Sequence, residues 1–122
     1  MCSIHVEDPP TAYKFYTEIL GFEVLLAVPE ANLYIVTSPE DPTKLGLLLE
    51  PSDNQVARDY MEGLHALGMP VIVLGVDDVK TEFARLSALG VRFTSEPASG
   101  ESGTSAVFDD TCGNYVQIHQ DA

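Results

Sequence analysis

Three side chains near the C-terminal end of the sequence recur at every second position. Tyr115, Gln117 and His119 alternate along the stretch DDTCGNYVQIHQ, residues 109–120. Alternate side chains of a strand point to one face of its sheet, so these three are expected to lie together. Amide and imidazole groups bind ligands by hydrogen bonds, and imidazole also transfers protons near neutral pH or ligates a metal. His5, in the strand-like stretch CSIHV, is a further candidate for this chemistry.

The balance of charge excludes two classes of partner. Nineteen acidic residues against six basic ones give a formal net charge of −13. Such a chain is repelled by nucleic acids and by anionic membrane surfaces, so neither is expected as a partner. If the carboxylates surround a pocket, they favour a cationic ligand, and otherwise they form a solvated acidic surface that keeps the protein soluble.

The remaining composition predicts a single domain located in the cytoplasm. The 122 residues fit one compact unit, and no apolar run approaches the roughly 20 residues that cross a bilayer. The N-terminus has no signal-peptide pattern. Cys2 and Cys112 form no CxxC pair, so a reducing compartment is expected.

The first half of the chain predicts a strand, a helix and three more strands. Asp8 is a good helix N-cap, Pro9 and Pro10 suit a first turn, and Gly21 is placed to end the helix. Between them, apolar residues recur at helical spacing. Strands are expected at residues 22–28, 33–38 and 44–50, separated by turns rich in proline and aspartate.

The second half repeats this order of elements. After a connector at 51–69 that contains its own helix, a strand at 71–76 leads into a helix at 77–90 that ends at Gly90. A short strand at 91–97 and two more at the C-terminal end complete the unit. A duplicated βαβββ unit is therefore predicted, which makes the fold class α+β with modules at 1–50 and 70–122.

Three stretches resemble the vicinal oxygen chelate superfamily, which includes glyoxalases, bleomycin-resistance proteins and extradiol dioxygenases. They are VEDPPTAYKFYTEILGF, VDDVKTEFARLSALGVRF and FDDTCGNYVQI. The last is similar to the turn that precedes the closing strand in that family. The resemblance implies two tandem βαβββ modules that form a cupped mixed eight-stranded sheet around a cavity. It does not fix the function, because this fold carries many activities.

Enzymatic members of the superfamily hold a metal ion in the cavity with His, Gln or Glu from four strands. The resemblance places these positions at Met1, Leu47, Val71 and Gln117. Three of the four carry no oxygen or nitrogen donor in their side chains, so a metal of the family type and any other cofactor are not expected. A shifted register would instead offer His5 and Glu50.

Strand alternation and the resemblance together give the residues expected to line the cavity. They are His5, Tyr34, Leu47, Leu49, Val71, Val73, Phe93, Tyr115, Gln117 and His119. An apolar wall with a few polar groups is typical of a small-molecule site. The alternative for this wall is a filled core. For Tyr34 and Phe93 the alternative is core packing, and for the two histidines it is a hydrogen-bonded structural role.

The function expected from these observations is metal-free binding of a small cationic or aromatic compound, of the bleomycin-resistance type. The alternative is a metal-dependent lyase, isomerase or dioxygenase of the same superfamily, with misregistered ligands. A metal-free enzyme that uses His5 or His119 as acid or base also stays open, although the missing ligands argue against an enzyme. A homodimer is expected, because a lone pair of modules leaves sheet edges and a concave face open.

Overall fold

The computed structural model describes residues 1–122 and has the predicted α+β fold. The first module contains one α-helix continued by a π-helical segment, and four strands: β1 (Cys2–Val6), α1 (Pro9–Lys14), η1 (Phe15–Ile19), β2 (Glu23–Val28), β3 (Leu33–Thr37) and β4 (Leu47–Pro51). The connecting helix and the second module follow: α2 (Gln55–Ala66), β5 (Pro70–Gly75), α3 (Val79–Ala88), β6 (Ala98–Gly100), β7 (Gly103–Asp109) and β8 (Tyr115–Asp121).

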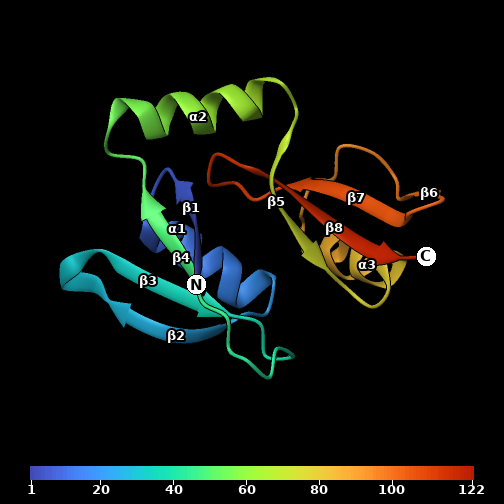
Figure 1. The fold of residues 1–122 in the computed structure, drawn as a ribbon, viewed down its shortest axis with the longest axis horizontal. Coiled ribbons are helices and arrows are strands. Elements are labelled where there is room, and N and C mark those ends of the chain that lie inside the picture. Colours follow the sequence, from blue (N-terminus) through green and yellow to red (C-terminus); the bar gives the residue numbers. More distant parts are fainter.

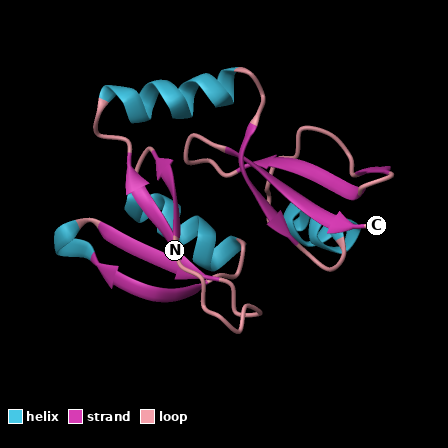
Figure 2. Ribbon diagram, viewed as in Figure 1, coloured by secondary structure: helices cyan, strands magenta, loops and turns pink.

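The eight strands form two four-stranded mixed sheets with the same internal order. The first runs β1-β4-β3-β2 and the second β5-β8-β7-β6, with β1 parallel to β4 and β5 parallel to β8. Figures 1 and 2 show the two sheets side by side, with α1 and α3 behind them and α2 bridging the modules. None of the helices is long and apolar enough to span a membrane. The two βαβββ-like modules confirm the predicted α+β class, although no ladder joins β1 to β5, so the strands form two four-stranded sheets and not one eight-stranded sheet.

Helix ends follow the residues that predicted them. Asp8 occupies the N-cap position of α1, with prolines in the first turn, and the Asp78 carboxylate accepts a hydrogen bond from Thr81 N at the start of α3. Gly21 and Gly90 have φ of 87° and 90° just beyond the two helical segments. Glycine adopts this left-handed conformation without the steric cost that a Cβ imposes, so it ends a helix well.

One hydrophobic core joins the modules. Sixteen buried residues from both halves form a single cluster. In it Phe15 lies with its ring centroid 6.2 Å from that of Phe108 and 5.5 Å from that of Tyr16. The segment after α1 therefore packs against the second sheet as well as its own, and this apolar burial stabilises the association of the modules.

The turn between β7 and β8 is fixed by a buried carboxylate. Asp110 is fully buried and accepts hydrogen bonds from the Tyr16 hydroxyl at 2.7 Å, from Cys112 N at 2.7 Å and from Asn114 N at 3.0 Å. A buried polar group without a hydrogen-bond partner costs free energy. Here the Asp110 carboxylate accepts from all three buried donors. Asp110 thus links η1 of one module to the last turn of the other.

The same turn is also hydrogen-bonded to the end of β1 and the residue that follows it. Glu7 N donates to Cys112 O at 3.0 Å, and Asn114 Nδ2 donates to His5 O at 2.8 Å. Gly113 has φ of 97°, and a Cβ placed there would lie only 2.8 Å from Glu7 Oε1. A larger residue here would displace the Glu7 side chain and would be strained by the positive φ, so glycine is favoured at this position.

Burial decides the protonation of the groups at this turn. It raises the pKa of Asp110, although the hydrogen bond from Tyr16 and those from the turn backbone act in the opposite direction. Burial, and then the Asp110 charge, raise the pKa of Tyr16 well above its ordinary value and that of Cys112 to about 12. Cys112 is consequently a protonated structural thiol and not a nucleophile.

The sixth strand lies later in the chain than predicted. Residues 91–97 form no ladder beyond an isolated bridge between Phe93 and Phe108, and β6 comprises Ala98–Gly100 paired with Gly103–Ser105. Phe93 instead packs between Phe83 and Phe108, at centroid distances of 4.6 and 5.5 Å. Phe93 is apolar because it packs against the core. In a segment this short, such a residue gives the same sequence pattern as a strand.

Candidate functional site

The outer face of the first sheet carries a histidine and a carboxylate side by side. The parallel pairing of β1 and β4 places His5 opposite Glu50, and His5 Nε2 lies 4.0 Å from Glu50 Oε2. The other ring nitrogen, Nδ1, lies 3.3 Å from Pro51 O. Both side chains are partly exposed. They form a polar corner at the end of β1 that can donate and accept hydrogen bonds.

The second sheet presents Tyr115, Gln117 and His119 on one face. Burial alternates along β8, with Val116 and Ile118 buried and these three half-buried, as the alternation predicts. Val73 of β5 lies opposite Gln117 in the register. The four side chains together give an amide and an imidazole set among apolar and aromatic groups.

Side-chain contacts lie at both ends of this face. The rings of Tyr115 and His65 stack with centroids 4.4 Å apart, and His65 Nε2 lies 3.7 Å from Asp109 Oδ2. At the other end, His119 Nε2 lies 3.3 Å from Asp121 Oδ1. The Tyr115–His65 stack joins α2 to the second sheet. No local sequence pattern predicts this contact.

The face predicted for β4 is wrong by one residue. Leu47 and Leu49 are buried at 5% and 0% exposure, because the register pairs them with Cys2 and Ile4 on the side covered by α1. Leu48 and Glu50 share the outer face with Ser3 and His5 instead. The run LLLE has no apolar–polar alternation, so the sequence alone does not distinguish the two faces.

Three other residues predicted to line the cavity pack in or against the core. Tyr34 is 6% exposed and lies 5.0 Å from Tyr13, centroid to centroid. Phe93 is packed between aromatic rings, and Val71 packs against the core at the irregularity where the β5 register shifts. Tyr34 therefore has a core-packing role, whereas Val71 and Phe93 are only partly buried, so a place in a cavity wall stays a prediction for these two.

The residues present do not fit the metal centre of enzymatic relatives. Of the four expected ligand positions, Met1, Leu47 and Val71 have no hard donor. The shifted register would use His5 and Glu50, which do lie together on the outer face, but these are only two donors. No three His, Cys, Asp or Glu side chains lie close enough together to hold a metal ion. His5 lies beside the start of β8, whereas His119 lies near its end, so one chain does not bring the two imidazoles together.

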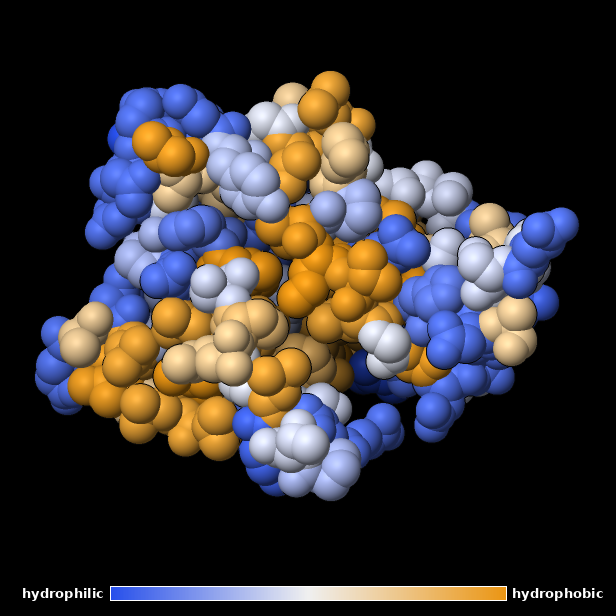
Figure 3. All heavy atoms as spheres, in the orientation of Figure 1, coloured by the Kyte–Doolittle hydropathy of each residue, from blue (hydrophilic) through white to orange (hydrophobic).

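Hydrophobic side chains gather over the same outer face. Figure 3 shows them across the centre and over the first sheet. Large apolar side chains that are roughly half or more exposed include Met1, Leu25, Leu26, Leu45 and Val73. Contiguous exposed apolar surface marks binding sites for ligands or partners far more often than scattered apolar residues do.

A groove of about 590 Å³ lies between the modules, next to the loop that joins β3 to β4. Of the residues predicted to line a cavity, its lining includes Leu47 and Val73 but none of His5, Gln117 or His119. Residues 38–41, Asp77 and Asp78 contribute to it, and all of them follow the ends of strands. Sequence reasoning missed them because loops have no periodicity that predicts which module they face.

The comparisons with known proteins agree with this fold over nearly the whole chain. Residues 1–118 match the Glyoxalase/Bleomycin resistance protein/Dioxygenase superfamily. The protein YurT of Bacillus subtilis (strain 168) is 43% identical over 120 residues, covering 97% of this chain and 94% of YurT.

Solved structures are similar over the same span. The crystal structure of UcmS2 has a TM-score of 0.81 at 29% identity, covering 98% of this chain and 95% of that one. TnmS3, an antibiotic binding protein from Streptomyces sp. CB03234, has a TM-score of 0.76 at 25% identity, covering 98% of this chain and 92% of TnmS3.

Proposed function

The chain belongs to the glyoxalase/bleomycin resistance protein/dioxygenase superfamily, and from this membership we propose that it is a metal-free protein that sequesters a small organic compound. The observation that carries the proposal is the outer sheet face, where exposed apolar side chains surround a few polar groups. Small-molecule sites typically have this make-up. The similarity to TnmS3, an antibiotic binding protein, supports binding over catalysis.

We place the ligand across the outer face, with distinct roles for its polar groups. Gln117 and His119 would hydrogen-bond the ligand from the second sheet, and the His5–Glu50 pair would do so from the first sheet of a second copy, since one chain does not bring the two imidazoles together. Tyr115, held by its stack on His65, would supply an aromatic wall. The net charge of −13 favours a ligand that carries a positive charge.

A second copy of the chain would close this face. In one chain β1 and β5 are both edge strands, and exposed edges beside an apolar face favour association. We therefore propose a homodimer in which each copy covers part of the other's ligand site. Light scattering is expected to give twice the monomer mass of 13.2 kDa, and a monomer at micromolar concentration would argue against it.

Native mass spectrometry of protein purified from cells tests the function directly. A co-purifying organic molecule without metal is expected, and stoichiometric divalent metal would overturn the proposal. Replacing Gln117 or His119 with Ala should weaken binding of that molecule by roughly 0.5–3 kcal/mol for each lost polar contact. Ser87→Ala, on the exposed side of α3, is the matched control and should leave binding unchanged.

A further inference from the structure

The two modules place equivalent loops at opposite ends of the molecule. In the register, Val36 pairs with Leu47 in the first sheet as Phe108 pairs with Val116 in the second. The loop at 38–46 and the turn at 110–114 therefore join equivalent strands. In Figure 1 the turn between β7 and β8 reaches toward β1 and α2, and the loop between β3 and β4 lies at the other end.

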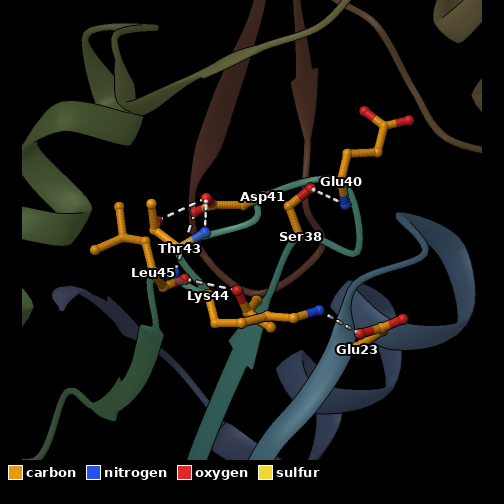
Figure 4. A network of polar contacts seen from close by, with 8 residues as sticks. Glu23, Ser38, Glu40, Asp41, Thr43, Lys44 and Leu45 are labelled. Atoms are coloured by element: carbon orange, nitrogen blue, oxygen red, sulfur yellow. Dashed lines mark hydrogen bonds and ion pairs between the residues drawn. The ribbon is translucent and has the colours of Figure 1, made fainter.

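The loop at 38–46 is held by contacts within its own module. Asp41 accepts hydrogen bonds from Thr43 N at 2.8 Å and Leu45 N at 3.1 Å, and Lys44 forms an ion pair with Glu23 at 3.2 Å (Figure 4). Gly46 O accepts from Cys2 N at 2.9 Å. No hydrogen bond joins this loop to the second module, in contrast to the buried Asp110 network at the equivalent turn.

The groove lies where the loop does not close against β5 and α3. Its floor is apolar and comes from both modules: Phe22, Leu47, Ile72, Leu74, Leu86 and Ile118. Figure 3 shows a hollow between the lower central lobe and the second module. A volume of about 590 Å³ is within the usual range for sites that hold small organic molecules.

The rim of the groove is acidic. Its carboxylates are Glu40, Asp41, Asp77, Asp78 and Glu82. The cationic side chain among them is Arg85, whose guanidinium already donates to Ile19 O at 3.0 Å and to Glu82 at 2.9 Å. Arg85 therefore does not neutralise the rest of the rim, and Glu40 and Asp77 form no ion pair with any side chain.

We propose that this groove is a second binding site, for an organic cation with a bulky apolar body. The body would lie on the apolar floor, and the positive charge would lie near Glu40 and Asp77. A bare metal ion does not fit, because no three carboxylate, thiol or imidazole side chains converge there. Gln117 and His119 are not part of its lining, although Val73, which lies opposite Gln117, belongs to both faces, so variants at Gln117 distinguish the two sites.

Two ions of the same shape and opposite charge test the proposal. Tetraphenylphosphonium and tetraphenylborate share an apolar body, so calorimetric titration with each separates charge from hydrophobic attraction. The phosphonium is expected to bind saturably, with one ion per chain, at least tenfold more tightly than the borate. Equal binding of the two ions, or no saturable binding of the phosphonium, would overturn the proposal.

Variants then locate the site. The double variant Glu40→Gln, Asp77→Asn should weaken phosphonium binding roughly two- to thirtyfold, as expected for the loss of two partly exposed ion pairs. Glu62→Gln, Glu101→Gln removes the same charge from exposed positions outside the groove and should have a much smaller effect. If both double variants weaken binding equally, the net charge and not the groove attracts the ion, and the proposal fails.

A third variant fills the groove without touching its charge. Thr81 lines the groove on the first turn of α3 and is exposed, so Thr81→Trp should obstruct it while the fold persists. Loss of phosphonium binding with an unchanged circular dichroism spectrum is expected. If Thr81→Trp retains phosphonium binding and Gln117→Ala loses it, the ion binds at the outer sheet face, and the second site is refuted.

Discussion

The turn between β7 and β8 and the loop between β3 and β4 occupy equivalent places in two similar modules, yet different contacts hold them. Asp110 at the turn is fully buried and bonded to Tyr16 of the other module, whereas Asp41 in the loop is bonded to Thr43 and Leu45 of its own segment. The first junction is closed and the second leaves a groove. A duplicated fold thus permits one copy of a junction to stabilise the chain and the other to stay open.

A single exchange of residue type accounts for much of this difference. Tyr16 and Leu86 each lie eight residues beyond the aspartate at the N-cap of their helix. The hydroxyl of Tyr16 reaches Asp110, whereas Leu86 offers no donor to Ser38, which is the loop residue equivalent to Asp110. Without a polar anchor the loop satisfies its own backbone, as exposed loops usually do.

The largest expected effect comes from removing the buried anchor. Asp110→Ala leaves the Tyr16 hydroxyl and two backbone N–H groups without their acceptor, so the free energy of unfolding should fall by about 3 kcal/mol or more. Ser38→Ala, at the equivalent position, should change it by less than ~0.5 kcal/mol. Urea unfolding followed by circular dichroism measures both. Equal losses in the two variants would contradict the contrast between the junctions.

Removing only the donor should have a smaller effect. Tyr16→Phe keeps the ring in the core but takes one hydrogen bond from Asp110, which should cost roughly 1–3 kcal/mol of unfolding free energy. Tyr34→Phe is the control, because Tyr34 is also buried but its hydroxyl forms no hydrogen bond within the chain. A Tyr16→Phe protein as stable as the control would show that the inter-module bond contributes little.

The stability due to Asp110 should depend on pH. Its raised pKa means that the native protein holds the proton more tightly than the unfolded chain does. The associated stabilisation is complete below the ordinary carboxyl pKa of 3.8 and is lost as the pH rises through the raised value. An asparagine side chain does not titrate in this range, so the stability of the parent relative to Asp110→Asn should decline with rising pH.

Urea unfolding between about pH 4 and about pH 7 covers the ordinary carboxyl pKa and the range above it. Asp53→Asn removes the same charge at an exposed position and corrects for the change in net charge. A stability difference between the parent and Asp110→Asn that increases with pH would mean that the native state favours the ionised carboxylate, contrary to the burial of this group.

Local sequence signals predicted most of the fold. The N-cap aspartates, the terminal glycines and the alternation around Gln117 act within a few residues, so they are readable from the chain. The face of β4 was not readable, because consecutive leucines leave the register to its pairing with β1. The β5 register shift at Pro70–Ile72 likewise depends on packing against β8.

The candidate site was less predictable, because it depends on contacts between distant segments. Tyr16 and Asp110 are 94 positions apart, and nothing near either residue indicates that they meet. The groove is likewise formed by loop 38–46 of one module and by β5 and α3 of the other. Its acidic rim was visible only as a net charge of −13, which does not specify where carboxylates gather.

The smallest expected effect concerns the open junction itself. Asp41→Ala removes the acceptor of Thr43 N and Leu45 N, so these two amides should exchange with solvent faster while Cys112 N keeps its protection. Hydrogen bonds, chiefly that from the Thr43 side chain, lower the pKa of Asp41. The stabilisation from these loop contacts is therefore fully present at neutral pH, and it is lost only as the pH falls through the lowered pKa.

Amide exchange measured by NMR distinguishes local from global loosening in this variant. Asp53→Ala is the matched control, since it removes an exposed carboxylate that forms no hydrogen bond with the backbone. Global stability should stay close to that of the parent, because the loop makes no hydrogen bond to the second module. If the Cys112 and Asn114 amides also lose protection, the two junctions are coupled through the shared core, and the groove is not free to open by itself.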